Sequence, residues 1–213
     1  MNAIEPGTVI YFGGKTVLAL LKISAVVFAI GFVAHWTSAF IRRFLAGLMG
    51  PTAFNLVFAP GIAIHEISHA FAALLFLHEI LDVKLFDLKA KDGSHGHVVS
   101  RPRPVSRFLY VLPAWIVIGE LFIGIAPLIV GPALSFISLY YLVPGGRFFI
   151  QHPSFHTLPM LTWQFGLWIY STIAIISQME LSSADLKGTW KGFACIVLCT
   201  FLGALLYFKM RHI

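Results

Sequence analysis

Residues 52–77 read TAFNLVFAPGIAIHEISHAFAALLFL, an apolar run that contains three ionisable side chains. About 20 consecutive apolar residues are enough for a helix to cross the hydrocarbon core of a bilayer. The run is longer than that, so we predict that it spans a membrane. His65, Glu66 and His69 then lie near the middle of the span, where ionisable groups are costly to bury and mark functional sites.

Lipid is the expected solvent for much of the remaining chain. Of the 213 residues, 58% are apolar and only 11% are charged, against roughly 25% charged in a typical soluble domain. We therefore expect residues 1–213 to form a single integral membrane domain in contact with the lipid bilayer. The net charge of +6 is carried by loops between apolar runs, which predicts topology signals and no nucleic-acid partner.

Four other apolar segments are long enough to span a membrane. We expect three simple spans, over residues 16–40, 158–178 and 190–208, and the first of them should stop at Arg42-Arg43. Residues 108–143 would form roughly 54 Å of helix, so we split them into two spans that turn near Gly124–Pro127. A single long, kinked helix is the alternative. The predicted fold class is all-α and polytopic, with about six transmembrane helices, or five under the alternative.

The distribution of basic residues orients these spans. With six spans, ten basic residues fall on the side that holds both termini and four fall on the other side. Because cytoplasmic loops are enriched in lysine and arginine, we expect a multi-pass protein of the cell (inner) membrane with both termini cytoplasmic. With five spans, the N-terminus stays inside and the C-terminus moves outside.

The polar segment 79–106 interrupts the apolar runs. Apolar and polar residues partly alternate from Val83 to Lys89, Asp92-Gly93 is a turn signal, and His97–Ser100 could form a second short strand. This pattern predicts a membrane-associated β-hairpin directly after the span that carries the two histidines.

The sequence His65-Glu66-Ile67-Ser68-His69 has the spacing of a zinc site on a helix. Residues four apart project from one face, so both imidazoles can bind one Zn²⁺ at about 2.0–2.1 Å. Glu66 points in an adjacent direction. It is not expected to be a ligand, and it is placed to act as the catalytic general acid/base on a water molecule.

A catalytic zinc ion needs a third protein ligand and an open position. We favour Asp185, which precedes the last predicted span and could instead cap that helix. Glu180 is the alternative, and it would resemble the ligand set of soluble HExxH proteases. The weaker candidates are Glu120, His95, His97, His152 and His156.

These features resemble the site-2 protease family of intramembrane zinc metalloproteases, over roughly Ala53–Arg103 and Ser182–Leu198. The resemblance implies that His65, His69 and Asp185 bind zinc and that Glu66 is the catalytic acid/base. It also implies that the hairpin aligns the substrate as an added strand. The chain departs from the family in its second motif, because Ser182–Gly188 lacks the family's Asn-x-x-Pro and its Asp-Gly pair.

The sequence thus predicts a zinc metalloendopeptidase that hydrolyses peptide bonds of a membrane-embedded or juxtamembrane protein or peptide substrate. One rival is an HExxH membrane protease of another class that uses Glu180 as the third ligand. The other rival is a non-catalytic membrane scaffold, transporter subunit or pseudoprotease, in which Glu66 could be lost without consequence.

Overall fold

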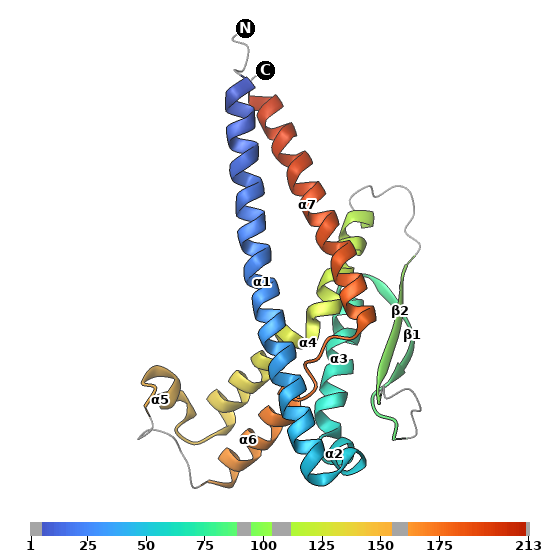
Figure 1. Ribbon diagram of the computed structural model, residues 1–213, viewed down its shortest axis with the longest axis vertical. Coiled ribbons are helices and arrows are strands. Elements are labelled where there is room, and N and C mark those ends of the chain that lie inside the picture. The colour runs from blue at the N-terminus through green and yellow to red at the C-terminus, as the bar shows by residue number, and fades with distance from the viewer. Residues whose placement is uncertain (1–5, 89–94, 104–111, 155–161, 212–213) are drawn as a thin grey trace.

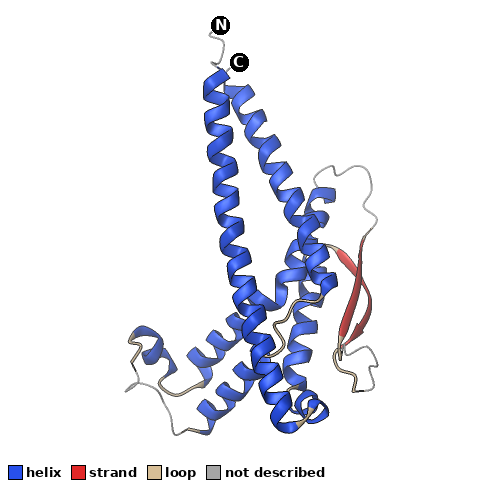
Figure 2. Cartoon of the chain, in the orientation of Figure 1, coloured by secondary structure: helices blue, strands red, loops and turns tan. Residues whose placement is uncertain are grey.

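The computed structural model describes residues 6–88, 95–103, 112–154 and 162–211. This part is mostly helical and contains one two-stranded antiparallel sheet, as Figures 1 and 2 show. The predicted helical class with a short hairpin is confirmed. The elements in chain order are α1 (Pro6–Met49), α2 (Pro51–Val57), α3 (Ala59–Leu75), β1 (His78–Lys84), β2 (His97–Pro102), α4 (Leu112–Leu142), α5 (Gly146–Gln151), α6 (Trp163–Ile176) and α7 (Ser183–Arg211).

Helix α1 is much longer than the span predicted over residues 16–40. Its 44 residues make a helix of roughly 66 Å. The helix passes through Arg42-Arg43, so the predicted stop there is wrong, because arginine is a good helix former and breaks no backbone hydrogen bond. The helix ends where Gly50 adopts a φ of +83° and Pro51 follows, a combination that does not continue a helix.

The span predicted over residues 52–77 is not one straight helix. It is divided at Phe58 into α2 and α3, which meet at an angle of 63°. Pro60 explains the break, because a proline cannot donate to the carbonyl of Leu56, and its ring would clash with that carbonyl in a continuous helix. His65, Glu66 and His69 lie together in α3.

Helix α4 is continuous from Leu112 to Leu142, with Pro127 and Pro132 inside it. The predicted division into two spans near Gly124–Pro127 is therefore wrong, and the single bent helix is observed. The helix changes direction along its length (Figure 1). Reversing the chain would need a turn, and neither Gly124 nor Gly131 has the positive φ found at Gly50 and Gly145.

The last two helices also differ from their predicted bounds. Helix α6 has 14 residues and begins at Trp163, and residues 158–161 of the predicted span lie outside the described residues. Helix α7 begins at Ser183, before the predicted residue 190, because Ser182 and Asp185 cap its first turn. Asp185 is therefore part of α7 and does not precede it.

The hairpin is confirmed, with β1 antiparallel to β2 and an irregularity between Ile80 and Asp82. The second strand matches the prediction closely. The first strand begins earlier than expected, directly after Leu77, whose φ of 61° turns the chain out of α3. The predicted turn at Asp92-Gly93 lies outside the described residues.

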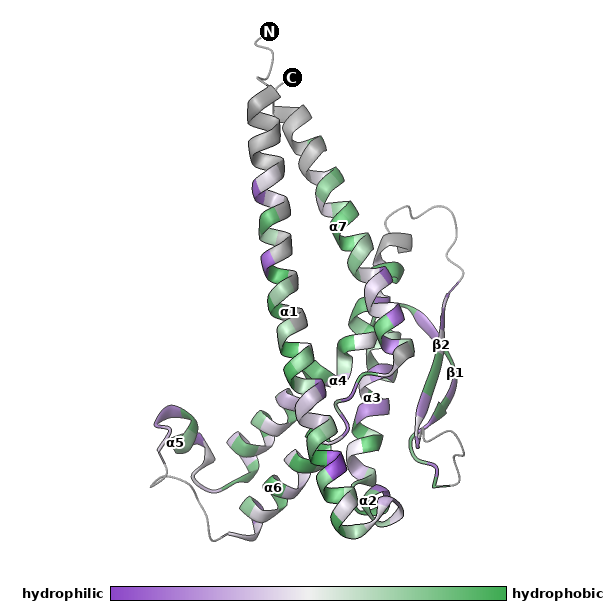
Figure 3. Ribbon diagram, in the orientation of Figure 1, coloured by the Kyte–Doolittle hydropathy of each residue, from purple (hydrophilic) through white to green (hydrophobic). Residues whose placement is uncertain are grey.

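In the described part of the chain, α4 is the helix that is long and apolar enough by itself to cross a membrane, over Trp115–Leu142. The bent pair of α2 and α3 would be a second crossing if the two helices form one broken span. Helix α6 is apolar but shorter. Figure 3 shows apolar residues over most of α4 and polar residues on the hairpin and the first turns of α7.

Glycines set the close packing of α7 against α4. A Cβ atom added at Gly124 or Gly192 would lie within 3 Å of atoms of the other helix, and one at Gly188 would lie 3.4 Å from the carbonyl oxygen of Glu120. Gly188 and Gly192 are four residues apart, the small-residue spacing that lets helices approach closely in membranes. This packing places the first turn of α7 beside α4 and brings Asp185 to 3.5 Å from His69 of α3.

Candidate metal centre

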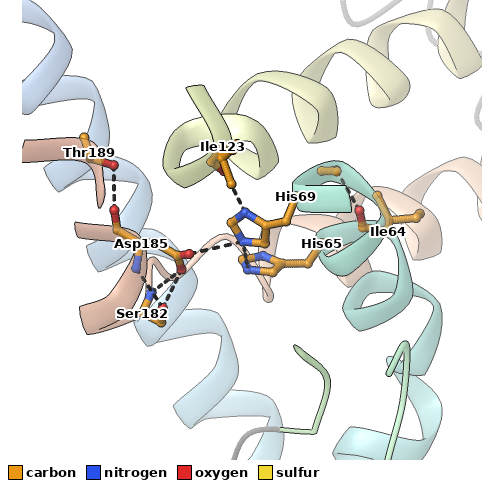
Figure 4. A network of polar contacts seen from close by, with 8 residues as sticks. Ile64, His65, His69, Ile123, Ser182, Asp185 and Thr189 are labelled. Atoms are coloured by element: carbon orange, nitrogen blue, oxygen red, sulfur yellow. Dashed lines mark hydrogen bonds and ion pairs between the residues drawn. The ribbon is translucent and has the colours of Figure 1, made fainter. Parts of the chain in front are cut away.

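His65 and His69 of α3 and Asp185 of α7 converge on one point, as Figure 4 shows. One nitrogen or oxygen atom of each side chain lies within 4.8 Å of the other two. The two Nε2 atoms are 3.0 Å apart, and Nε2 of His69 is 3.5 Å from Oδ1 of Asp185. The structure therefore brings together the three residues that the sequence predicted as zinc ligands.

These separations suit a tetrahedral zinc site. With bonds of 2.0–2.1 Å and tetrahedral angles, neighbouring ligand atoms are about 3.3 Å apart. The observed 3.0 Å and 3.5 Å bracket that distance. The described cluster supplies three of the four atoms that a tetrahedral zinc ion binds.

Ile123 fixes the orientation of the His69 ring. Nδ1 of His69 is 2.7 Å from the carbonyl oxygen of Ile123 in α4. A carbonyl oxygen can only accept a hydrogen bond, so Nδ1 carries a proton and donates it. In the neutral ring, Nε2 then presents its lone pair toward His65 and Asp185.

The donor set therefore fits a cation. In that tautomer of the neutral ring, Nε2 of His69 is an acceptor; it faces Oδ1 of Asp185 at 3.5 Å with little solvent access and lies 3.0 Å from Nε2 of His65. His65 is also poorly compensated, since its buried Nδ1 makes no hydrogen bond of good geometry and has the backbone of Gln178 as a polar neighbour. Two imidazole nitrogens and one carboxylate oxygen are ligands that suit Zn²⁺.

The two oxygens of Asp185 have different roles. Oδ2 accepts hydrogen bonds from the backbone N–H of Ser182 at 2.8 Å and from its hydroxyl at 2.6 Å. The Ser182 hydroxyl oxygen lies 3.1 Å from the backbone nitrogen of Asp185 and caps it in return. This reciprocal cap holds the carboxylate in place and leaves Oδ1 for the cluster. The capping role that the sequence offered as an alternative is thus present alongside the position in the cluster.

Glu66 lies beside the cluster but is not part of it. Its residue is only 8% exposed, and its side chain faces the start of β2. A Cβ atom at Gly96 would be 2.7 Å from Cγ and 3.0 Å from Oε1 of Glu66, so glycine is needed at this contact. The position agrees with the predicted geometry, in which Glu66 is adjacent to the two histidines and is not a ligand.

The structure does not bring Glu180 to the cluster. Its Oε2 is 2.6 Å from an Nη of Arg42, in an ion pair that ties α1 to the connection between α6 and α7. Because the described cluster of possible metal ligands contains Asp185 and not Glu180, the geometry favours Asp185 as the third ligand.

The remaining candidates also lie elsewhere. Oε2 of Glu120 is 3.5 Å from Nζ of Lys191, His152 directly follows α5, and His156 lies outside the described residues. Nε2 of His95 is 2.7 Å from the amide nitrogen of Asn55, which connects the hairpin to α2.

His97 belongs to the exposed surface of the hairpin, where its Nε2 is 2.8 Å from Oδ2 of Asp82. This hydrogen bond lowers the pKa of the Asp82 carboxyl below its ordinary value. Lys84 forms an ion pair with Asp87, whose hydrogen bond raises the pKa of the lysine. These pairs stabilise the hairpin and do not reach the cluster.

Sequence reasoning missed three features that build the site. The first is the carbonyl of Ile123, for which the only signal is a proline four residues later. The second is Ser182, which forms a Ser-x-x-Asp cap with Asp185 and is recognisable from spacing alone. The third is the Gly188-x-x-x-Gly192 spacing that lets α7 approach α4.

No protein-family model, curated protein or solved structure matches this chain. The resemblance to site-2 proteases therefore stays a prediction, and the functional argument depends on the geometry of the cluster.

Proposed function

We propose that this chain is an intramembrane zinc metalloendopeptidase in which His65, His69 and Asp185 hold Zn²⁺ and Glu66 is the general acid/base. The observation that carries the proposal is the convergence of two imidazole nitrogens and one carboxylate oxygen, 3.0 Å and 3.5 Å apart along two edges of the cluster, beside the buried side chain of Glu66. A carboxylate oxygen with little solvent access is stabilised by a cation, and the two neighbouring imidazole nitrogens can bind the same ion.

The proposed reaction is hydrolysis of a peptide bond. A bound zinc ion would supply a Lewis acid that polarises the scissile carbonyl and makes a water molecule acidic. Glu66 accepts a proton from the attacking water molecule as the oxygen atom of that water bonds to the carbonyl carbon of the substrate. Glu66 then returns the proton to the amide nitrogen as the C–N bond breaks, which yields a carboxylic acid and an amine; the acid then passes its proton to the amine, giving a carboxylate and an ammonium group.

The hairpin supports a way to present an extended substrate. A helical segment hides its carbonyl groups, so a membrane-embedded substrate must be unwound before cleavage. A substrate segment could add to a free edge of the β1–β2 sheet, where backbone hydrogen bonds would hold it extended. Because Glu66 packs against Gly96 at the start of β2, a strand bound there would lie near the catalytic carboxylate.

We further propose a multi-pass arrangement with fewer crossings than the sequence predicted. Both described ends of the chain lie at the same end of the molecule, and α6 and α7 both run toward it (Figure 1). In this proposal α1, the bent pair α2–α3 and α4 each cross, and α6 with α7 together make the fourth crossing. Both termini are then on one side of the membrane, which we propose is the cytoplasmic side, while α5, which contains Arg147, lies in the part of the molecule away from the two ends of the chain (Figure 1).

Zinc content tests the proposal most directly. Detergent-purified wild type should contain about one zinc per chain, and His69→Ala and Asp185→Ala should contain little. Glu180→Ala is the matched control, because Glu180 pairs with Arg42 and should not change the zinc content. Absence of zinc from the wild type after reconstitution would refute the metalloprotease and leave the membrane scaffold as the better explanation.

Cleavage by the zinc-loaded protein separates an enzyme from a metal-binding scaffold. Glu66→Gln should retain zinc and lose cleavage of a transmembrane peptide library, since an amide cannot accept the proton from water. Unchanged cleavage in that variant would contradict the role of Glu66.

A further inference from the structure

Pro127 lies inside α4, where a proline has two consequences for the backbone. It has no N–H group to donate, and its ring pushes away the carbonyl of the residue four positions earlier. That residue is Ile123. The Ile123 carbonyl therefore loses its ordinary partner within the helix and needs another donor.

His69 is the donor that the structure supplies. Its Nδ1 lies 2.7 Å from the Ile123 oxygen, across the contact between α3 and α4 (Figure 4). In an unbroken helix, each backbone carbonyl already accepts a hydrogen bond from the N–H group of the residue four positions later. An imidazole approaching such a carbonyl would share it with that backbone N–H, and the imidazole bond would be weaker.

We propose that Pro127 is a positioning residue, which frees the Ile123 carbonyl so that His69 is held with Nε2 toward His65 and Asp185. The inference depends on the proposed metal site for its significance, but the orientation of His69 is measurable without metal. In metal sites, a backbone carbonyl that accepts a hydrogen bond from the other ring nitrogen commonly fixes both the tautomer and the ring orientation of a metal-binding histidine.

Pro132 provides a matched control in the same helix. It also lies in the helix interior and frees a carbonyl four residues earlier, that of Leu128. The hydrogen bonds and the ion pair described for the two histidines of the cluster go to Ile123, to each other and to Asp185, and not to the Leu128 carbonyl. Replacing Pro132 by alanine therefore tests the general effect of restoring a helical hydrogen bond, without altering the partner of His69.

The first experiment measures the tautomer of His69 in metal-free protein, by long-range ¹H–¹⁵N NMR of ¹⁵N-histidine-labelled samples. Wild type and Pro132→Ala should show His69 protonated on Nδ1. Pro127→Ala should show a mixture of tautomers, because the new N–H of residue 127 competes for the Ile123 carbonyl. A wild-type His69 that is not protonated on Nδ1 would overturn the inference even if Pro127→Ala does not fold.

The second experiment measures zinc affinity by competition with a chromogenic chelator. Pro127→Ala should bind zinc about 10–100-fold more weakly than wild type, the usual loss when such a partner is removed. Pro132→Ala should match the wild type. Equal affinity and equal tautomers in Pro127→Ala and wild type would refute the positioning role. If the wild type and both variants fail to bind zinc while the His69 tautomers are as expected, the metal site is refuted and the orientation of His69 remains established.

Discussion

Replacing Asp185 by asparagine should have opposite effects on stability with and without zinc. In the structure, Oδ1 of Asp185 faces Nε2 of His69 at 3.5 Å, and Oδ2 accepts the cap from Ser182. Asparagine keeps an oxygen for the cap and places an N–H₂ group where Oδ1 was. Two facing acceptors then become a donor and an acceptor.

The expected increase in the stability of the metal-free Asp185→Asn variant follows from one new hydrogen bond, between the asparagine N–H₂ group and Nε2 of His69. A net contribution of about 1 kcal/mol corresponds to roughly 2–4 °C in unfolding temperature for a chain of this length. The metal-free Asp185→Asn variant should therefore unfold at a higher temperature than the metal-free wild type.

Zinc reverses the order of the two proteins. At a free concentration 100 times the dissociation constant, a ligand stabilises the native state by about 2.7 kcal/mol, or roughly 5–10 °C here. The wild type should gain this stabilisation, and the variant should gain almost none because it lacks a carboxylate ligand. Zinc should therefore place the wild type above the variant.

Thermal unfolding in one detergent measures the four unfolding temperatures, those of the wild type and of Asp185→Asn, each with excess chelator and with buffered zinc. Asp185→Ala serves as the control, because it loses both the metal ligand and the cap and should be less stable under both conditions. A lower unfolding temperature for Asp185→Asn than for wild type in chelator would refute the reasoning. It would mean that His69 is protonated and forms an ordinary ion pair with Asp185.

Three further changes test the surroundings of the site. Ser182→Ala should lower the unfolding temperature, since losing an N-cap costs about 1 kcal/mol, and should weaken zinc binding measured by chelator competition. Glu180→Gln should lower the unfolding temperature by separating α1 from the connection before α7 while zinc affinity stays unchanged; a large loss of affinity would restore Glu180 as a ligand candidate. The lowered pKa of Asp82 means that its bond with His97 stabilises the hairpin above the ordinary carboxyl pKa and is lost as pH falls through the lowered value. Hairpin amide exchange, corrected for intrinsic rates, should therefore accelerate in acid in the wild type and change less in Asp82→Asn.

The part of the site that depends on local spacing could be predicted from the sequence. His65 and His69 are four residues apart on a helix, so their shared face follows from helix geometry alone. Asp185 could be proposed because it is near the start of a helix. Its approach to the histidines could not be derived, since that approach depends on the packing of α7 on α4 through Gly188 and Gly192.

The helix boundaries show why proline alone is an ambiguous signal. Pro60 coincides with a 63° break between α2 and α3, while Pro127 lies inside a continuous α4. Both remove a backbone donor. At Pro127 the carbonyl that is left free finds a partner on another helix, His69, and this contact cannot be read from residues near the proline in sequence. Whether a proline ends a helix therefore depends on tertiary structure.

Glu66 distinguishes the proposed enzyme from a protein that only binds metal. A metal-binding scaffold needs the three ligands and nothing from the next residue. Glu66 is nevertheless 8% exposed, makes no ion pair in the described part of the chain, and is accommodated by a glycine at position 96. Burying a carboxylate without a partner of opposite charge lowers stability. A scaffold would have no reason to retain that cost, whereas a protease needs a carboxylate beside its metal ligands to move the protons of water.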